Sequence, residues 1–134
     1  MLDHTLDELL LAALKALPAL SSLHGYTGHD GADHKLPALT VSTTSEPLAG
    51  SDSAFRGEVG VIVESEAHDT TAAAHGERVE AVRSALANRA GVIAALNATG
   101  RLLIYGYAPL GTEPSASDAR FTTKLRYRFG FGTG

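Results

Sequence analysis

The stretch that most constrains the fold runs from Gly57 to Asn88, where a strand pattern passes through a polar corner into a helix pattern. Three valines at 59, 61 and 63 alternate with Glu58, Gly60, Ile62 and Glu64, and this period of two is typical of a half-buried strand. The corner that follows offers Asp69 or Thr70 as a helix N-cap. Apolar residues then recur at three- and four-residue steps, which places them on one helix face. These residues are Ala72, Val79, Val82 and Leu86, together with His75. A strand and a helix with one apolar face each predict a two-layer α+β core.

Length and composition limit the class of protein. A chain of 134 residues is long enough for one domain with its own core, and we expect a single domain over residues 1–134. A formal net charge of −4 gives no whole-chain basic field that would attract DNA. The absence of cysteine excludes disulfide scaffolds, thiolate zinc sites and cysteine nucleophiles. The start lacks the basic region of a signal peptide, and no apolar run is long enough to span a bilayer. We therefore expect no membrane association.

An amphipathic helix is expected near the amino terminus. Thr5-Leu6-Asp7-Glu8 matches the capping box, in which the threonine hydroxyl and the glutamate side chain satisfy two free backbone N–H groups. A broad apolar stripe follows, and Pro18 ends the helix. The stripe consists of Leu6, Leu9, Leu10, Ala13, Leu14 and Leu17. We expect it to pack in the core, and the alternative is that part of its width serves a subunit contact.

The segment over residues 21–35 is rich in glycine, histidine and aspartate. Its imidazole and carboxylate side chains are ligand types that suit zinc or nickel: His24, His29, Asp30, Asp33 and His34. Their spacing matches no defined site, so we expect a solvated loop and no metal or cofactor. The alternative is a small metal-binding α+β enzyme that uses these residues, or His68 and Asp69, for acid–base chemistry. His75 lies on the apolar helix face and is expected to be a packed or interface histidine rather than a ligand.

The remaining segments complete the expected fold. They are a strand over 36–45, a turn-rich link over 46–53, a short helix or turn over 91–100, an inner strand over 101–107, a long loop over 108–118 and a strand over 121–131. With the two amphipathic helices, this order predicts an α+β fold. A small, mostly antiparallel sheet of about four strands would pack against two main helices.

Two strands carry opposite charges at alternating positions. The central strand has acidic residues on one face, and the final strand has basic residues on the face opposite its aromatic side chains. These candidate subunit-interface residues are Glu58, Glu64, Glu66, Lys124, Arg126 and Arg128. If the strands are neighbours, the two sets have the signs needed for cross-strand pairs. The bases are also suited to nucleic acid, but no aromatic side chains interleave with them for base stacking. We therefore favour sheet pairing or an intersubunit salt bridge.

The order of elements resembles the tail terminator, or tail completion, proteins of long-tailed bacteriophages. Three stretches carry the resemblance. They are the leucine helix with Leu36-Pro37-Ala38-Leu39-Thr40-Val41, the strand from Gly57 to Ala67 that leads into the helix from Val79 to Leu86, and Leu96-Asn97-Ala98-Thr99-Gly100 with Leu102-Leu103-Ile104-Tyr105-Gly106 and the final strand. The likeness covers most of the chain as a pattern of elements.

The resemblance implies a structural virion protein and no enzyme. Tail terminators form a hexameric ring on the last ring of the tail tube protein, stop tube growth, and provide the surface that joins the head connector or stopper. The implied location is the tail or neck of the virion, after assembly in the host cytoplasm, and DNA passes through the ring without specific binding. The alternatives are another head–tail connector, such as a neck or stopper protein, and a plain dimeric binding domain. A ring needs heterologous faces, for which the loops over 21–35 and 108–118 offer material.

Overall fold

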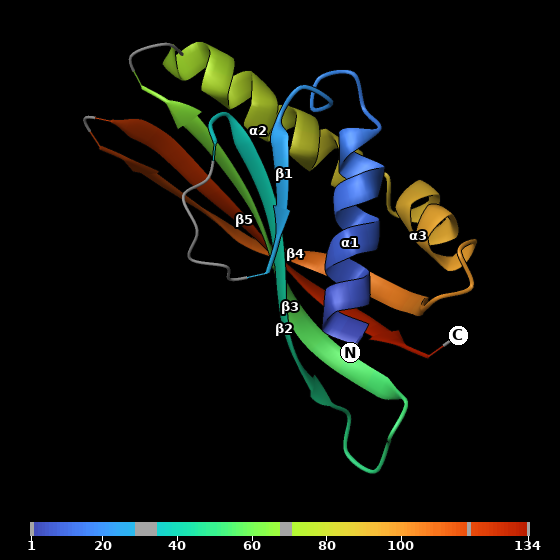
Figure 1. The fold of residues 1–134 in the computed structure, drawn as a ribbon. Coiled ribbons are helices and arrows are strands. Elements are labelled where there is room, and N and C mark those ends of the chain that lie inside the picture. Colours follow the sequence, from blue (N-terminus) through green and yellow to red (C-terminus); the bar gives the residue numbers. More distant parts are fainter. Residues whose placement is uncertain (1, 29–34, 68–70, 118, 134) are drawn as a thin grey trace.

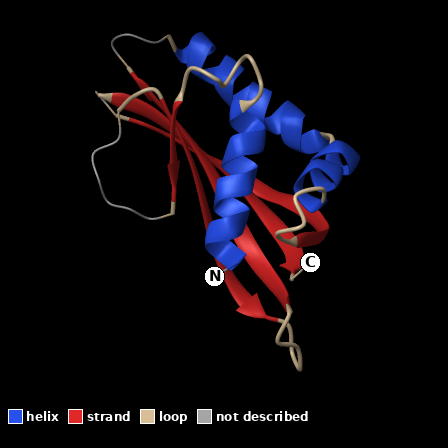
Figure 2. Cartoon of the chain, turned by 45° about the vertical axis from the view of Figure 1, so that its right-hand side comes forward, coloured by secondary structure: helices blue, strands red, loops and turns tan. Residues whose placement is uncertain are grey.

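The computed structural model describes residues 2–28, 35–67, 71–117 and 119–133, and within them three helices lie on one side of a five-stranded sheet (Figure 1). The elements in chain order are α1 (Leu2–Lys15), β1 (His24–Thr27), β2 (Ala38–Pro47), β3 (Ala54–Glu66), α2 (Ala72–Ala87), α3 (Arg89–Asn97), β4 (Leu103–Ala116) and β5 (Arg120–Gly132). Figure 2 shows the same two layers from a second direction, with the β2–β3 hairpin projecting beyond the helices. None of the described helices is long and apolar enough to cross a membrane.

The strands follow the order β1-β2-β3-β5-β4, so β3 is the middle strand. β1 runs parallel to β2, and the other neighbours are antiparallel. The α+β class is therefore confirmed. The expected number of about four strands was too low by one, whereas the two main helices and a further short helix were expected. β1 lies within the predicted 21–35 loop, and the segment predicted as a short helix or turn is the helix α3.

The core lies between the helices and one face of the sheet. Val59, Val61 and Val63 of β3 are fully buried, as the alternation predicted, and Val61 has Val41 and Leu125 as its cross-strand neighbours. α1 packs over β1 and β2, α2 over β3 and β5, and α3 over β4. The buried stripe of α1 is Leu6, Leu10 and Leu14. Burial of these apolar side chains, at about 25 cal/mol per Å² removed from water, is the main force that holds the two layers together.

The start of α1 differs from the capping-box prediction. The helix begins at Leu2, so Thr5 and Glu8 lie inside it rather than at its end. Polar contacts with β2 hold this end instead, because the Thr43 hydroxyl donates to Asp7 Oδ1 at 2.6 Å and Ser45 hydrogen-bonds Asp3. Burial raises the pKa of the Asp7 carboxyl, an effect that the hydrogen bond from Thr43 opposes.

The start of α2 is set by Thr71, whose Oγ1 accepts a hydrogen bond from the backbone N–H of Ala74 at 3.1 Å. The predicted caps, Asp69 and Thr70, lie outside the described residues. Threonine at this position satisfies one of the free N–H groups of the first turn.

The segment predicted as an inner strand followed by a loop is one long edge strand. β4 continues to Ala116 because it pairs with β5 over nearly its whole length, and this pairing outweighs the turn-forming residues within it. Pro109 and Pro114 are tolerated because an edge strand has one side with no partner for an N–H group. The pairing register between β4 and β5 changes at two places in β4, at Tyr105 and at Leu110. These shifts and the prolines protect the edge against addition of a further strand.

A buried polar network joins α2 to the sheet. His75 Nδ1 lies 2.8 Å from Ser65 Oγ, and His75 Nε2 lies 2.9 Å from Thr123 Oγ1. Arg78 donates to Ser65 Oγ at 2.8 Å, and the serine hydroxyl can in addition either donate to Nδ1 or accept from it. The two hydroxyls can therefore hold a neutral imidazole in either tautomer. Burial, and secondarily the charge of Arg78, lowers the pKa of His75.

We predict that His75 makes the stability of the fold depend on pH. The pKa of His75 in the folded state lies below the ordinary 6.5. Between these two pKa values the unfolded chain is protonated at His75 and the folded chain is not. The stabilisation is complete above pH 6.5 and is lost as the pH falls towards the folded-state pKa. Denaturant unfolding at pH 8 should show His75→Gln to be less stable than the wild type by about 1–3 kcal/mol. At pH 5 the difference should shrink, and an unchanged difference would contradict a neutral buried imidazole.

Candidate interaction surfaces

The helix-free face of the sheet carries most of the charged strand residues. Side chains alternate along each strand, so burial of one face of β3 and β5 places the other set of positions on the opposite face. On β3 this set includes Glu58 and Glu64, and on β5 it includes Lys124, Arg126 and Arg128. The described helices all lie on the other side of the sheet (Figures 1 and 2).

Ion pairs cross the strands on this face. Arg126 Nε donates to Glu58 Oε1 at 2.6 Å, and Arg126 Nη1 lies 3.4 Å from Glu113 Oε2 on β4. The hydrogen bond and charge of Glu58 raise the pKa of Arg126. Arg120 Nη1 lies 2.7 Å from Glu64 Oε2, where the glutamate side chain is 12% exposed. The expected cross-strand pairing is therefore confirmed for Glu58 and Arg126, and Glu64 pairs with a base that was not predicted.

The partners differ in detail from the alternation pattern. Glu58 lies directly opposite Arg128 but pairs with Arg126, two positions away on the same face. Glu66 lies opposite Arg120. Arg120 and Glu113 were not among the predicted residues, because the final strand was predicted to begin one residue later and the second half of β4 was predicted to be a loop. A correct extent of β4 and β5 would have identified both.

The other two predicted bases make no ion pair with the described residues. The side chain of Lys124 lies along β3 over Gly60, where an added Cβ would come within 2.7 Å of Lys124 Cε. Arg128 is exposed. Whether the six predicted residues face another subunit stays a prediction.

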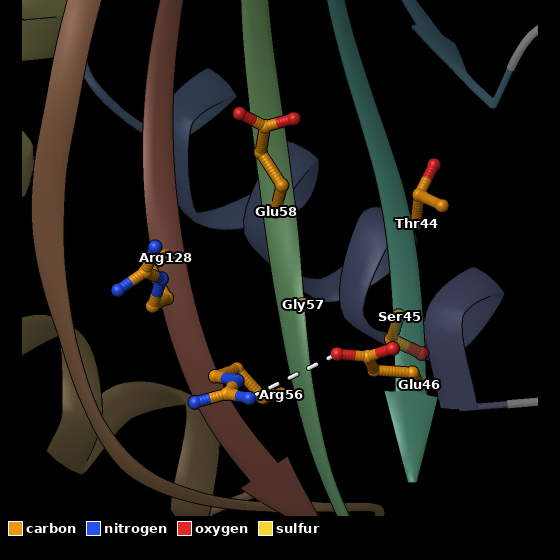
Figure 3. A pocket seen from close by; sticks show the side chains of 7 residues that line it. All are labelled: Thr44, Ser45, Glu46, Arg56, Gly57, Glu58 and Arg128. Atoms are coloured by element: carbon orange, nitrogen blue, oxygen red, sulfur yellow. Dashed lines mark ion pairs between the residues drawn. The ribbon is translucent and has the colours of Figure 1, made fainter.

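A hollow of about 440 Å³ lies at one end of this face, lined by residues of β2, β3 and β5 (Figure 3). Arg56 reaches towards Glu46 across the strands, with Nη2 3.9 Å from Oε1. Arg128 lies beside them with its guanidinium directed away from Glu58. The lining therefore contains both signs of charge and is suited to polar contacts rather than to an apolar ligand.

The helix layer contains two apolar hollows. A groove of about 560 Å³ runs between α1, α2 and α3, with Leu10, Leu17, Ala85 and Val92 in its lining. Part of the leucine stripe of α1 therefore lines this groove instead of being covered by the rest of the core. A smaller pocket of about 220 Å³ lies between the carboxyl-terminal end of α2, the start of α3, and β4 with β5.

The candidate metal and acid–base residues are mostly outside the described part of the chain. His29, Asp30, Asp33, His34, His68 and Asp69 all lie there, and His24 lies on β1. Among the described residues, no three histidine, aspartate or glutamate side chains lie close enough together to hold a metal ion. His75 is buried in the network with Ser65 and Thr123, which agrees with the prediction of a packed histidine.

Comparison with known proteins does not identify a family for this chain. No family model and no curated protein matches the chain. Among solved structures 26 chains match. One of them, whose title states no function, is 16% identical over 95% of this chain and 89% of its own length, with a TM-score of 0.47. A likeness of this size carries no argument about function.

We predict that the Glu64–Arg120 pair contributes little to stability. Arg120 is 46% exposed, and a solvated ion pair gains little because water screens the attraction. A double-mutant cycle with Glu64→Gln and Arg120→Gln should give a coupling of at most about 1 kcal/mol, which declines in 1 M salt. A salt-independent coupling of several kcal/mol would contradict this. Glu77→Gln, at an exposed position on α2, is the matched control.

Proposed function

We propose that this chain is a structural subunit of a phage tail, which forms a ring at the head-proximal end of the tail tube. There it would end tube polymerisation and provide the surface that joins the head connector. The support from sequence is the resemblance in element order. Its place would be the tail or neck of the virion, and its partners further copies of itself, the tail tube protein and the connector or stopper protein.

The observation that carries the proposal is that unlike surfaces lie on different sides of one small domain. The helix-free face is charged and ion-paired, whereas the helix layer opens an apolar groove between α1, α2 and α3. The β4 edge adds exposed apolar side chains, with Tyr105 54% exposed. A closed ring needs two different, complementary patches on each subunit, and unlike surfaces on separate sides meet that need.

The form of the β4 edge favours contacts through side chains. Pro109 and Pro114 offer no backbone N–H to a further strand, and the register shifts interrupt the pairing surface. A subunit that joined others by open-ended strand addition would present a regular edge. Contacts between side-chain surfaces instead fix the angle between subunits, which a ring requires.

The mixed charge of the helix-free face is compatible with a channel for DNA. Arg126 and Arg120 are already paired with glutamates of β3. Neutralised arginines release few counterions from DNA, so a surface of this kind binds the duplex weakly and lets it slide. A neck or stopper protein is the nearest alternative function and shares this requirement.

Mass in solution, measured by light scattering over a concentration series with a metal assay on the same sample, tests this proposal. We predict a metal-free ring, or a monomer that becomes a ring on tail tubes. A stable dimer that carries about one metal per chain would contradict the proposal. It would favour the metal-binding enzyme, with chemistry in the histidine-rich segment over 21–35.

A further inference from the structure

The tip of the β2–β3 hairpin is an exposed and ordered knob. It spans residues 48–53, and it projects from the end of the sheet past the helices (Figures 1 and 2). Leu48 is 37% exposed at its base. Asp52 is exposed and makes no hydrogen bond or ion pair with the described residues. The knob therefore presents one large apolar side chain and one unpaired carboxylate.

The tip is held in one conformation by its own hydrogen bonds. Ser51 Oγ accepts from the backbone N–H of Ser53 at 3.2 Å and from that of Ala54 at 3.1 Å. The N–H of Leu48 donates to the carbonyl of Ala54 at 2.9 Å. Gly50 adopts a φ of 76°, which other residue types rarely adopt, so glycine fits the turn. A preorganised segment loses little entropy when it binds.

The smaller apolar pocket, of about 220 Å³, is a concave surface that could receive a projecting side chain. Leu86, Pro109 and the rings of Tyr107 and Tyr127 contribute to its walls. Its volume of about 220 Å³ is below the roughly 300–1,000 Å³ of sites for whole small molecules, and suits one side chain of a partner. The Tyr107 hydroxyl donates to the carbonyl of Leu86 at 2.6 Å, which fixes that wall.

Three arginines line this pocket, and one of them lacks a carboxylate partner. Arg83 lies 2.6 Å from Glu80, and Arg126 is paired with Glu58 and Glu113. The guanidinium of Arg89 lies 5.8 Å from the centre of the Tyr107 ring and makes no ion pair within the described chain. Arg89 is exposed at the start of α3, where it is available to an incoming carboxylate.

We infer that the hairpin tip of one copy of this chain docks in the Arg89 pocket of the next. Leu48 fills the apolar pocket and Asp52 pairs with Arg89. Burial of an aliphatic side chain in a fitted pocket supplies affinity, and the charge pair at its rim supplies orientation. The knob and the pocket are different surfaces of one chain. The contact is therefore heterologous and repeats from subunit to subunit, as a ring requires.

The inference rests on the proposed function for its biological meaning, but disulfide trapping tests it separately. The natural chain has no cysteine, so introduced thiols react only with each other. We would mix full-length Leu48→Cys with full-length Ala87→Cys, which places a thiol in the pocket lining, and oxidise the mixture. The expected product is a cross-linked dimer of one chain of each kind, at a yield about tenfold above that of either chain alone. Trapping captures weak association, so the test does not need a stable ring.

Two further variants test the charge pair and the choice of knob. Arg89→Glu in the pocket copy should abolish the cross-link, and Asp52→Arg in the knob copy should restore it. Leu103→Cys is the matched control for Leu48→Cys, since Leu103 is 38% exposed on the β4 edge. A cross-link from Leu103→Cys of equal yield would overturn the inference, and so would a Leu48→Cys cross-link that ignores Arg89→Glu.

The two proposals fail in different ways. A wild-type ring without the Leu48–Ala87 cross-link would overturn the docking inference and leave the ring function standing. The specific cross-link without any ring, in solution or on tubes, would support the docking contact and overturn the ring.

Discussion

The packing of three helices against one face of the sheet is the constraint on which the rest of the structure depends. Val61 and its neighbours on β3 are fully buried between the layers, and Leu10 of α1 and Val82 of α2 belong to the same buried cluster. Because side chains alternate along a strand, this burial forces the glutamates of β3 onto the opposite face. The ion pairs with β5 follow from the same register. The packing of the helices on one face of the sheet thus makes that face apolar and the opposite face charged.

The difference between the two faces also gives the molecule surfaces of different chemical character. The helix side of the molecule has an apolar groove between α1, α2 and α3, and a smaller apolar pocket where α2 and α3 meet β4 and β5. The sheet has two edges with different protection, since β1 is a short parallel strand and β4 carries prolines and register shifts. Distinct patches of this kind suit repeated contact between copies, and they are the physical basis for our proposal of a ring-forming structural protein.

The sequence predicts those parts of the structure that depend on local periodicity. The valine alternation of β3 and the stripe of α2 identify the core, because burial of one face imposes a period. β1 was missed because four residues in a glycine-rich segment form a strand only by pairing with β2. β4 was misjudged because pairing with β5 overrides the turn preference of Pro109. The Arg89 pocket has no sequence signal, since its walls come from four separate elements.

The length distribution of tail tubes tests the central claim most directly. Tail tube protein encoded in the same genome as this chain would be polymerised with and without the purified protein, and tube lengths would be measured by electron microscopy. The account predicts that growth stops and that the protein is found at one end of each tube, in the amount of one ring. Tubes of unchanged length with no protein at their ends would contradict it.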